Sequence, residues 1–111
     1  MFDFIIIGGG IIGLLTAKEL QKTGAKVAVI EKNSPGQQAT WAAGGILSPM
    51  RPWHYSEPVN AISNISQAIY QQLATELLQH TGIDPEWTLS GMLVLNDEDL
   101  PPAIDWCQQR Q

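Results

Sequence analysis

The chain has 111 residues, of which 44% are hydrophobic and 15% are charged, and its formal net charge is −5. This composition is typical of a globular protein rather than a disordered one, and no apolar run approaches the roughly 20 residues of a membrane helix. The six basic residues are scattered, which argues against nucleic acid as a partner, and the lone Cys107 excludes an internal disulfide and favours a reducing cytoplasm.

Residues 4–31 predict a strand, a tight glycine turn, a helix and a second strand. The all-apolar run at residues 4–7 is typical of a strand buried on both faces of a parallel sheet. Gly8, Gly10 and Gly13 then form the pattern G-x-G-x-x-G. The first glycine permits a sharp turn, the second lets the backbone approach a pyrophosphate, and the third lets the helix pack closely on the sheet. The helix N-terminus directs free N–H groups and a positive dipole end at such phosphates.

The second buried strand is predicted over residues 27–30, and Glu31 ends it. About 20 residues separate the glycine turn from this acid, which is the spacing that places a carboxylate on the ribose hydroxyls of an adenosine. A carboxylate repels a 2′-phosphate, so an NADP-type ligand is disfavoured. The alternative is a βαβ unit that has a glycine turn and binds no ligand. The agreement of strand, turn, helix and acid favours a dinucleotide site.

Residues 37–47 are rich in small side chains and predict neither a strand nor a long helix. Such a segment suits a place where backbone passes close to a bulky, flat ligand. Thr40 adds a hydroxyl that can donate to a phosphate or to a ring heteroatom. The alternative is a flexible loop of small residues, and the glycine motif upstream makes ligand binding the preferred interpretation.

Residues 48–58 hold three prolines and predict an irregular connection or lid. Arg51, His54 and Tyr55 have the chemistry to contact a substrate, but such residues in a polar loop are more often solvated. Apolar residues then recur at helical spacing and predict an amphipathic helix from about residue 60 to 80, which Thr81 and a following glycine end.

The last part of the chain predicts two strands and a helix. Residues 87–89 and 92–95 are strand candidates, which together predict the start of a second sheet. The acids at residues 97–99 precede two prolines, a pattern that predicts a helix start. A doubly wound dinucleotide domain needs several parallel strands, and only two are recognisable here. The chain is therefore interpreted as the N-terminal fragment of a larger α/β protein.

Three of these stretches carry a resemblance to a known family. They are the turn GGGIIG at residues 8–13, the pair Glu31-Lys32, and ATWAAGGILSP at residues 39–49. They resemble the FAD-dependent D-amino-acid oxidase superfamily, and within it the glycine oxidase branch of bacterial thiamine biosynthesis. The resemblance spans essentially the whole chain and is strongest through about Leu47.

Carried over by position, the resemblance implies three groups of FAD-binding residues. The pyrophosphate group comprises Gly8, Gly10, Ile11, Ile12, Gly13, Ala39 and Thr40. The adenosine group is Glu31 at the ribose and Lys32 beside the adenine, and the isoalloxazine group is Gly44, Gly45 and Ile46. The catalytic residues are unknown, because the family's substrate-binding side chains lie beyond the last residue of this chain, and no metal ligand is expected.

The resemblance also implies the reaction, an oxidative deamination of glycine or a related small amino acid or amine. A hydride passes from the α-carbon to flavin N5, the imine is hydrolysed, and oxygen reoxidises the flavin to give hydrogen peroxide. The alternatives are a D-amino-acid dehydrogenase, a sarcosine oxidase, or a nucleotide-binding module without redox activity. The small-residue segment at 39–46 argues against the last of these, because a plain NAD domain does not need it.

The expected organisation has three parts. Residues 1–57 are the N-terminal part of an FAD-binding Rossmann-like domain, residues 58–82 are a long helix, and residues 83–111 begin a substrate-binding domain. The fold class is α/β, with an incomplete βαβ unit on a parallel sheet and the start of a second sheet. The expected partners are a small amino acid or amine, with self-association into a homo-oligomer left open. The 111-residue chain by itself is expected to be inactive.

Overall fold

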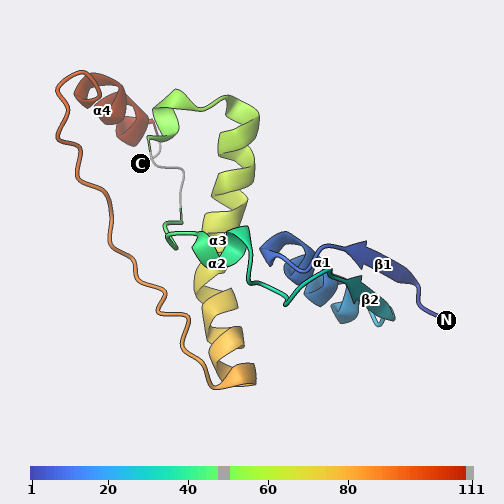
Figure 1. The fold of residues 1–111 in the computed structure, drawn as a ribbon. Coiled ribbons are helices and arrows are strands. Elements are labelled where there is room, and N and C mark those ends of the chain that lie inside the picture. The colour runs from blue at the N-terminus through green and yellow to red at the C-terminus, as the bar shows by residue number, and fades with distance from the viewer. Residues whose placement is uncertain (48–50, 110–111) are drawn as a thin grey trace. The chain divides into compact units, whose positions relative to one another are not determined.

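A computed structural model describes residues 1–47 and 51–109 (Figure 1). The chain divides into two compact units, Met1–Ile46 and Leu47–Gln111, and each is described by itself. The first unit contains β1 (Phe4–Ile7), α1 (Ile11–Lys22), β2 (Val27–Ile30) and the short helix α2 (Ala39–Ala42). The second contains the 3-10 helix η1 (Pro52–His54), α3 (Glu57–Thr81) and α4 (Leu100–Gln108).

The first unit is a βαβ unit, as the sequence predicts. Strands β1 and β2 pair in parallel, with Phe4 opposite Val27 and Ile7 opposite Ile30. The Gly8 N–H donates to the Ile30 carbonyl at 2.8 Å, so the pairing continues one residue beyond β1 into the glycine turn. The α/β class and the parallel sheet are therefore confirmed.

The burial of the two strands differs from the prediction. A strand covered on both faces was expected at β1, yet Ile5 is 62% exposed and Ile7 is 87% exposed. Helix α1 is the element of this unit that packs on the sheet, with Ala17 as its buried residue. One helix covers only one face of a sheet, so within this unit part of the apolar surface of β1 remains open.

Helix α3 confirms the predicted amphipathic helix and begins slightly earlier. Ser56 is its N-cap, and Glu57 provides an acid in the first turn, where the helix dipole favours a negative charge. Gly82 ends the helix with a φ of +70°, and its N–H donates to the Leu78 carbonyl at 2.9 Å. Glycine adopts this left-handed conformation at little cost, which explains why the helix ends there.

The predicted second sheet is not formed in the described part of the chain. Residues 83–96 contain no strand, including the two candidates at 87–89 and 92–95. Their residue types favour extended backbone, but a strand also needs a partner for its N–H and C=O groups, and no described segment pairs with them. Helix α4 does begin after Asp99, as predicted.

Two further points concern the second unit. The predicted connection at residues 48–58 is described only from residue 51, and residues 48–50 lie outside the described residues. Among the helices that the structure describes, none is long and apolar enough to cross a membrane.

Candidate functional site

The glycine turn between β1 and α1 needs two of its glycines for steric reasons. Gly8 has a φ of +105°, a conformation that other residues rarely adopt, and it turns the chain sharply at the end of β1. A Cβ at Gly13 would overlap the carbonyl oxygen of Gly8 and would lie 3.3 Å from the Ile6 side chain. The first turn of α1 can therefore approach the end of β1 only because residue 13 has no side chain.

The N-terminus of α1 presents backbone N–H groups beside this turn. The first hydrogen bond within the helix runs from the Leu14 N–H to the Gly10 carbonyl at 2.9 Å. The preceding N–H of Ile11 donates to the Thr40 hydroxyl at 2.9 Å. The N–H groups of Ile12 and Gly13 have no hydrogen-bond partner among the described residues. Such free N–H groups and the helix dipole favour an anion at this position.

Glu31, directly after β2, is held by two backbone N–H groups. Its Oε2 accepts from the Gly9 N–H at 2.7 Å, and its Oε1 accepts from the Asn33 N–H at 2.9 Å. The Gly9 hydrogen bond, followed by that of Asn33, lowers the pKa of the Glu31 carboxyl below its usual range. The carboxylate is therefore ionised at neutral pH, fixed in orientation, and able to accept further hydrogen bonds.

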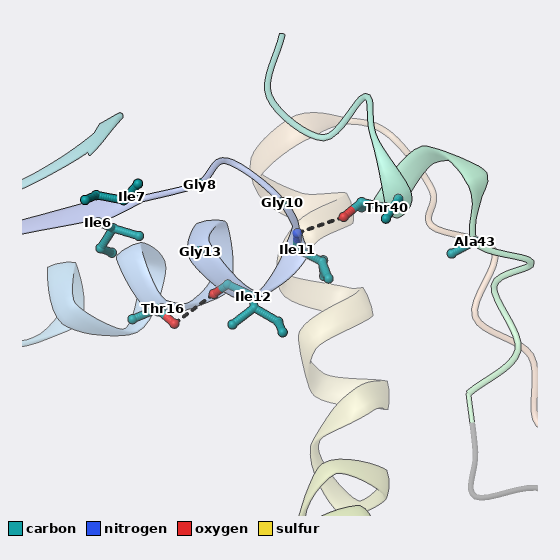
Figure 2. A pocket seen from close by; sticks show the side chains of 11 residues that line it. Ile6, Ile7, Gly8, Gly10, Ile11, Ile12, Gly13, Thr16, Thr40 and Ala43 are labelled. Atoms are coloured by element: carbon teal, nitrogen blue, oxygen red, sulfur yellow. Dashed lines mark hydrogen bonds between the residues drawn. The ribbon is translucent and has the colours of Figure 1, made fainter. Parts of the chain in front are cut away.

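An open cavity of about 530 Å³ lies against the glycine turn (Figure 2). One wall is formed by the end of β1, the turn and the first turns of α1, from Ile6 to Thr16. The other wall is formed by Ala39, Thr40 and Ala43. The cavity thus joins the two stretches that the sequence singles out, and the dashed line from Ile11 to Thr40 in Figure 2 connects its two walls.

The structure brings most of the predicted site residues together. Seven of them line the cavity, namely Gly8, Gly10, Ile11, Ile12, Gly13, Ala39 and Thr40. Glu31 contacts the same turn through Gly9 and does not line the cavity, and Lys32 follows it as an exposed residue. Gly44, Gly45 and Ile46 are exposed and stand outside the cavity lining.

Sequence reasoning missed the role of Gly9. This residue occupies a variable position of the glycine motif, so the motif assigns it no task. In the structure it donates to Glu31, and a Cβ at this position would lie 3.1 Å from the Glu31 Cβ. Its carbonyl also accepts from the Gly36 N–H at 2.8 Å. The run of three glycines was a signal for this role. A glycine at the middle position permits another group, here the Glu31 side chain, to approach the backbone closely.

A second polar cluster, also missed, lies in the unit Leu47–Gln111. The Asp99 side chain is only 6% exposed, and its Oδ1 accepts from Trp53 Nε1 at 3.2 Å and contacts His54 Nε2 at 2.7 Å. Its Oδ2 lies 3.4 Å from Arg51 Nε. The His54 contact, followed by that of Trp53, lowers the pKa of Asp99. Arg51 and His54, which were proposed as solvated or substrate-facing, thus contact a buried carboxylate and connect η1 to α4.

Asn60 supports the same region from α3. It is 2% exposed, and its Nδ2 donates to the carbonyls of Pro52 at 3.0 Å and of Tyr55 at 3.3 Å. Arg51 has a φ of +56°, which is uncommon for a residue with a side chain. Among the described residues, two buried oxygens of this cluster, Asn60 Oδ1 and Asp99 Oδ2, have no hydrogen-bond partner. The other contacts of Asp99 and Asn60 connect η1, α3 and the start of α4, so we interpret this cluster as a structural connection.

Comparison with known proteins identifies the family of this chain. Residues 3–111 match the model of the family described as FAD dependent oxidoreductase (DAO). The chain is 42% identical over 105 residues to a glycine oxidase from Pseudomonas aeruginosa, covering 95% of this chain and 29% of that protein. A glycine oxidase from Pseudomonas putida is 40% identical over 107 residues, with 96% of this chain and 29% of that protein covered.

A solved structure has the same arrangement. The crystal structure of glycine oxidase from Bacillus cereus matches with a TM-score of 0.79 at 33% identity, covering all of this chain and 31% of that one. The chain thus spans about three tenths of the length of the relatives it matches. The family match extends over nearly every residue, and the chain belongs to the FAD dependent oxidoreductase (DAO) family.

Proposed function

We propose that this chain forms the FAD-binding N-terminal part of an oxidase that acts on glycine or a related small amino acid. The observation that carries the proposal is the pairing of two features on one turn. The N-terminus of α1, which is part of residues 8–13, has free N–H groups at Ile12 and Gly13. The oriented carboxylate of Glu31 accepts a hydrogen bond from Gly9 of the same turn. These features suit the diphosphate and the ribose of an adenosine diphosphate group, and the similarity to glycine oxidases supports FAD as the cofactor.

The turn fits a diphosphate in charge and in space. The N–H groups of Ile12 and Gly13 are donors for anionic oxygens. The Thr40 hydroxyl accepts the Ile11 N–H, and its own hydrogen is a further donor. Gly10 has no side chain, and a Cβ there would project to within 3.3 Å of the Thr40 hydroxyl, across the cavity. We assign Gly8, Gly10, Ile11, Ile12, Gly13, Ala39 and Thr40 to the diphosphate.

Glu31 fits the adenosine ribose. Gly9 and Asn33 each occupy one lone pair of its carboxylate, and each oxygen keeps capacity to accept from a ribose hydroxyl. Its negative charge opposes a 2′-phosphate and so favours FAD over an NADP-type ligand. Lys32 is assigned to the adenine, and Gly44, Gly45 and Ile46 are assigned to the isoalloxazine by their position in the family.

The chemistry of the proposed reaction belongs to the cofactor. When bound, FAD supplies the acceptor for hydride transfer from the amine α-carbon, after which imine hydrolysis and oxygen reduction complete the reaction. The residues of this chain bind and orient it: the α1 N–H groups hold the diphosphate, and Glu31 holds the ribose. No residue here is assigned a catalytic role, and the 111 residues alone are proposed to be inactive.

We also propose a three-part organisation for the whole protein. Residues 1–57 belong to the FAD-binding domain, residues 58–82 form a long helix, and residues 83–111 begin the substrate-binding domain. The span of α3 over Glu57–Thr81 supports the second part, whereas the two compact units divide between residues 46 and 47 and not at residue 57. A cytoplasmic location is proposed from the single cysteine, and self-association into a homo-oligomer stays an open part of the proposal.

The test is an anaerobic titration of the full-length protein with glycine, sarcosine and D-alanine, followed by visible absorbance. Bleaching of a flavin band by glycine at the lowest concentration supports the proposal. Preferential bleaching by sarcosine or D-alanine favours another flavoprotein of the superfamily. A flavin band that no amine bleaches rejects amine oxidation while leaving the cofactor in place, and absence of flavin rejects the cofactor assignment.

A further inference from the structure

The segment that forms the second wall of the cavity has little packing of its own. From residue 37 to residue 47, every residue is exposed except Thr40, which is half-buried. The one regular element here is α2, with four residues. A helix this short is unstable by itself, because nucleation costs more conformational entropy than one turn of hydrogen bonds returns. The position of this wall must therefore depend on contacts with the rest of the unit.

Those contacts are few and can be named. Where the segment begins, the Gly36 N–H donates to the Gly9 carbonyl at 2.8 Å. Four residues later, Thr40 Oγ1 accepts the Ile11 N–H at 2.9 Å. In the part of the chain that the structure describes, no backbone–backbone hydrogen bond joins residues 37–47 to α1. Figure 2 shows this bond as the dashed line between Ile11, at the helix N-terminus, and Thr40.

The chemistry of a hydroxyl suits it to this position. The Ile11 N–H belongs to the first turn of α1, where backbone donors have no partner within the helix. The Thr40 oxygen accepts this donor, and its own hydrogen remains available for a second bond. A threonine can thus attach the segment to the helix and still present a donor to the cavity, which an aliphatic residue of the same shape cannot do.

We propose that Thr40 is a positioning residue, a tether that holds residues 37–46 against the N-terminus of α1 and so forms the cavity before any ligand binds. The tether acts through the Ile11 N–H and does not require a ligand. Only the identity of the ligand as FAD rests on the proposed function. FAD would then bind a site whose two walls are already in place. Preorganisation of this kind raises affinity by lowering the entropy lost on binding.

The experiment compares full-length wild-type protein with Thr40→Val and Thr40→Ser, each freed of bound cofactor, by hydrogen–deuterium exchange of residues 39–46. Valine keeps the shape of threonine without the hydroxyl, and serine keeps the hydroxyl. Loss of one neutral hydrogen bond should raise the exchange rate of this segment about fivefold in Thr40→Val. Thr40→Ser should exchange like wild type, which separates the hydroxyl from the packing of the methyl group.

Thr16→Val is the matched control. Thr16 lines the same cavity, but its hydroxyl donates to the Ile12 carbonyl of its own helix at 2.7 Å. Loss of the Thr16 hydroxyl in Thr16→Val should leave the hydrogen–deuterium exchange rate of residues 39–46 unchanged. If residues 39–46 of Thr40→Val exchange at the wild-type rate, the tether is wrong. It is also wrong if Thr40→Ser or Thr16→Val raises the exchange rate as much as Thr40→Val does. FAD added to each protein then forms a separate arm, in which Thr40→Val should bind about fivefold more weakly.

The two arms separate failure of the tether from failure of the proposed function. If wild-type protein does not bind FAD, the proposed function fails while the exchange measured without ligand still decides the tether. If wild-type protein binds FAD and Thr40→Val exchanges normally, the tether fails and the cofactor assignment stands.

Discussion

The Glu31 carboxylate accepts a 2.7 Å hydrogen bond from the Gly9 N–H, which lies 22 residues earlier in the chain. This bond connects the residue after β2 to the turn after β1, at the same edge of the parallel sheet. It fixes the orientation of the acid that we propose binds the adenosine ribose, and it lowers the pKa of that carboxyl. The acid and the glycine turn, two separate signals in the sequence, are therefore one structural unit.

Replacing Glu31 by alanine tests that unit. The variant removes the proposed acceptor for the ribose and leaves the Gly9 and Asn33 N–H groups without their side-chain partner. We expect FAD to bind roughly ten- to a hundredfold more weakly, as for loss of hydrogen bonds to a charged group. The dissociation constant is measured by fluorescence titration of the full-length protein with FAD.

Glu19→Ala serves as the control for this variant. Glu19 lies on α1 and pairs with Lys22 at 2.9 Å, and both side chains are more than half exposed. Its removal should leave the FAD dissociation constant unchanged, because a surface pair of this kind contributes little. An unchanged constant in Glu31→Ala as well would mean that Glu31 does not bind the ribose.

Gly13→Ala should destabilise the protein. The new Cβ would overlap the Gly8 carbonyl oxygen, so the helix must move away from the end of β1. Overpacking of this kind costs about 1–3 kcal/mol, and the thermal unfolding midpoint of the full-length protein should fall accordingly. Gly44→Ala is the matched control, because a Cβ there has no atom within 4 Å. Equal midpoints for Gly13→Ala and wild type would refute the close approach.

Gly10→Val should remove bound flavin while the fold persists. Gly10 has an extended conformation that valine can adopt, and its Cβ would project toward the Thr40 hydroxyl across the cavity. The two methyl groups would then occupy the space proposed for the diphosphate. We expect the purified variant to lack the visible flavin spectrum and to keep the wild-type circular dichroism. Gly10→Ala should give an intermediate flavin content, whereas wild-type flavin content in Gly10→Val would contradict the diphosphate assignment.

The parts of the fold that sequence could predict are those with local signals. The βαβ unit follows from an apolar run at residues 4–7, a glycine motif directly after it, and a second apolar run at residues 27–30, one helix further along the chain. Helix α3 follows from its apolar period and from Gly82, whose left-handed conformation ends it. These features depend on backbone conformation and on steric limits within short stretches, which residue type largely determines.

Other parts depend on partners that are distant in the sequence. The strands expected at residues 87–95 are absent because residue type favours extended backbone but cannot supply a partner strand. The Gly9 bond to Glu31 joins a variable motif position to the residue directly after the next strand, so no spacing rule predicts it. The contact of His54 with Asp99 joins residues 45 apart through two short elements, and only the folded chain shows it.

Asp99 is the basis of the last prediction. Its buried carboxylate contacts Arg51, Trp53 and His54, and these contacts connect η1 to the first turn of α4. Asp99→Asn keeps the size of the side chain and removes its charge, so Arg51 loses its counter-ion and the contacts of Trp53 and His54 no longer end on a charged oxygen. The thermal unfolding midpoint of the full-length protein, followed by tryptophan fluorescence, should fall by about 2–6 °C at neutral pH. Asp97→Asn, an exposed carboxylate two residues away, should leave the midpoint unchanged.

The pH dependence of this difference has a definite sign. The folded protein lowers the pKa of Asp99, chiefly through His54, so the unfolded chain binds the proton more tightly than the folded one. The stabilisation is therefore complete above the ordinary aspartate value of about 3.9 and is lost as the pH falls through the lowered pKa. The difference between wild type and Asp99→Asn should be present above the ordinary aspartate value and should shrink toward zero as the pH falls through the lowered pKa of Asp99. A difference that stays constant to the lowest pH would show that the charge of Asp99 does not stabilise the connection between η1 and α4, because neutralising that charge would then have no effect on stability.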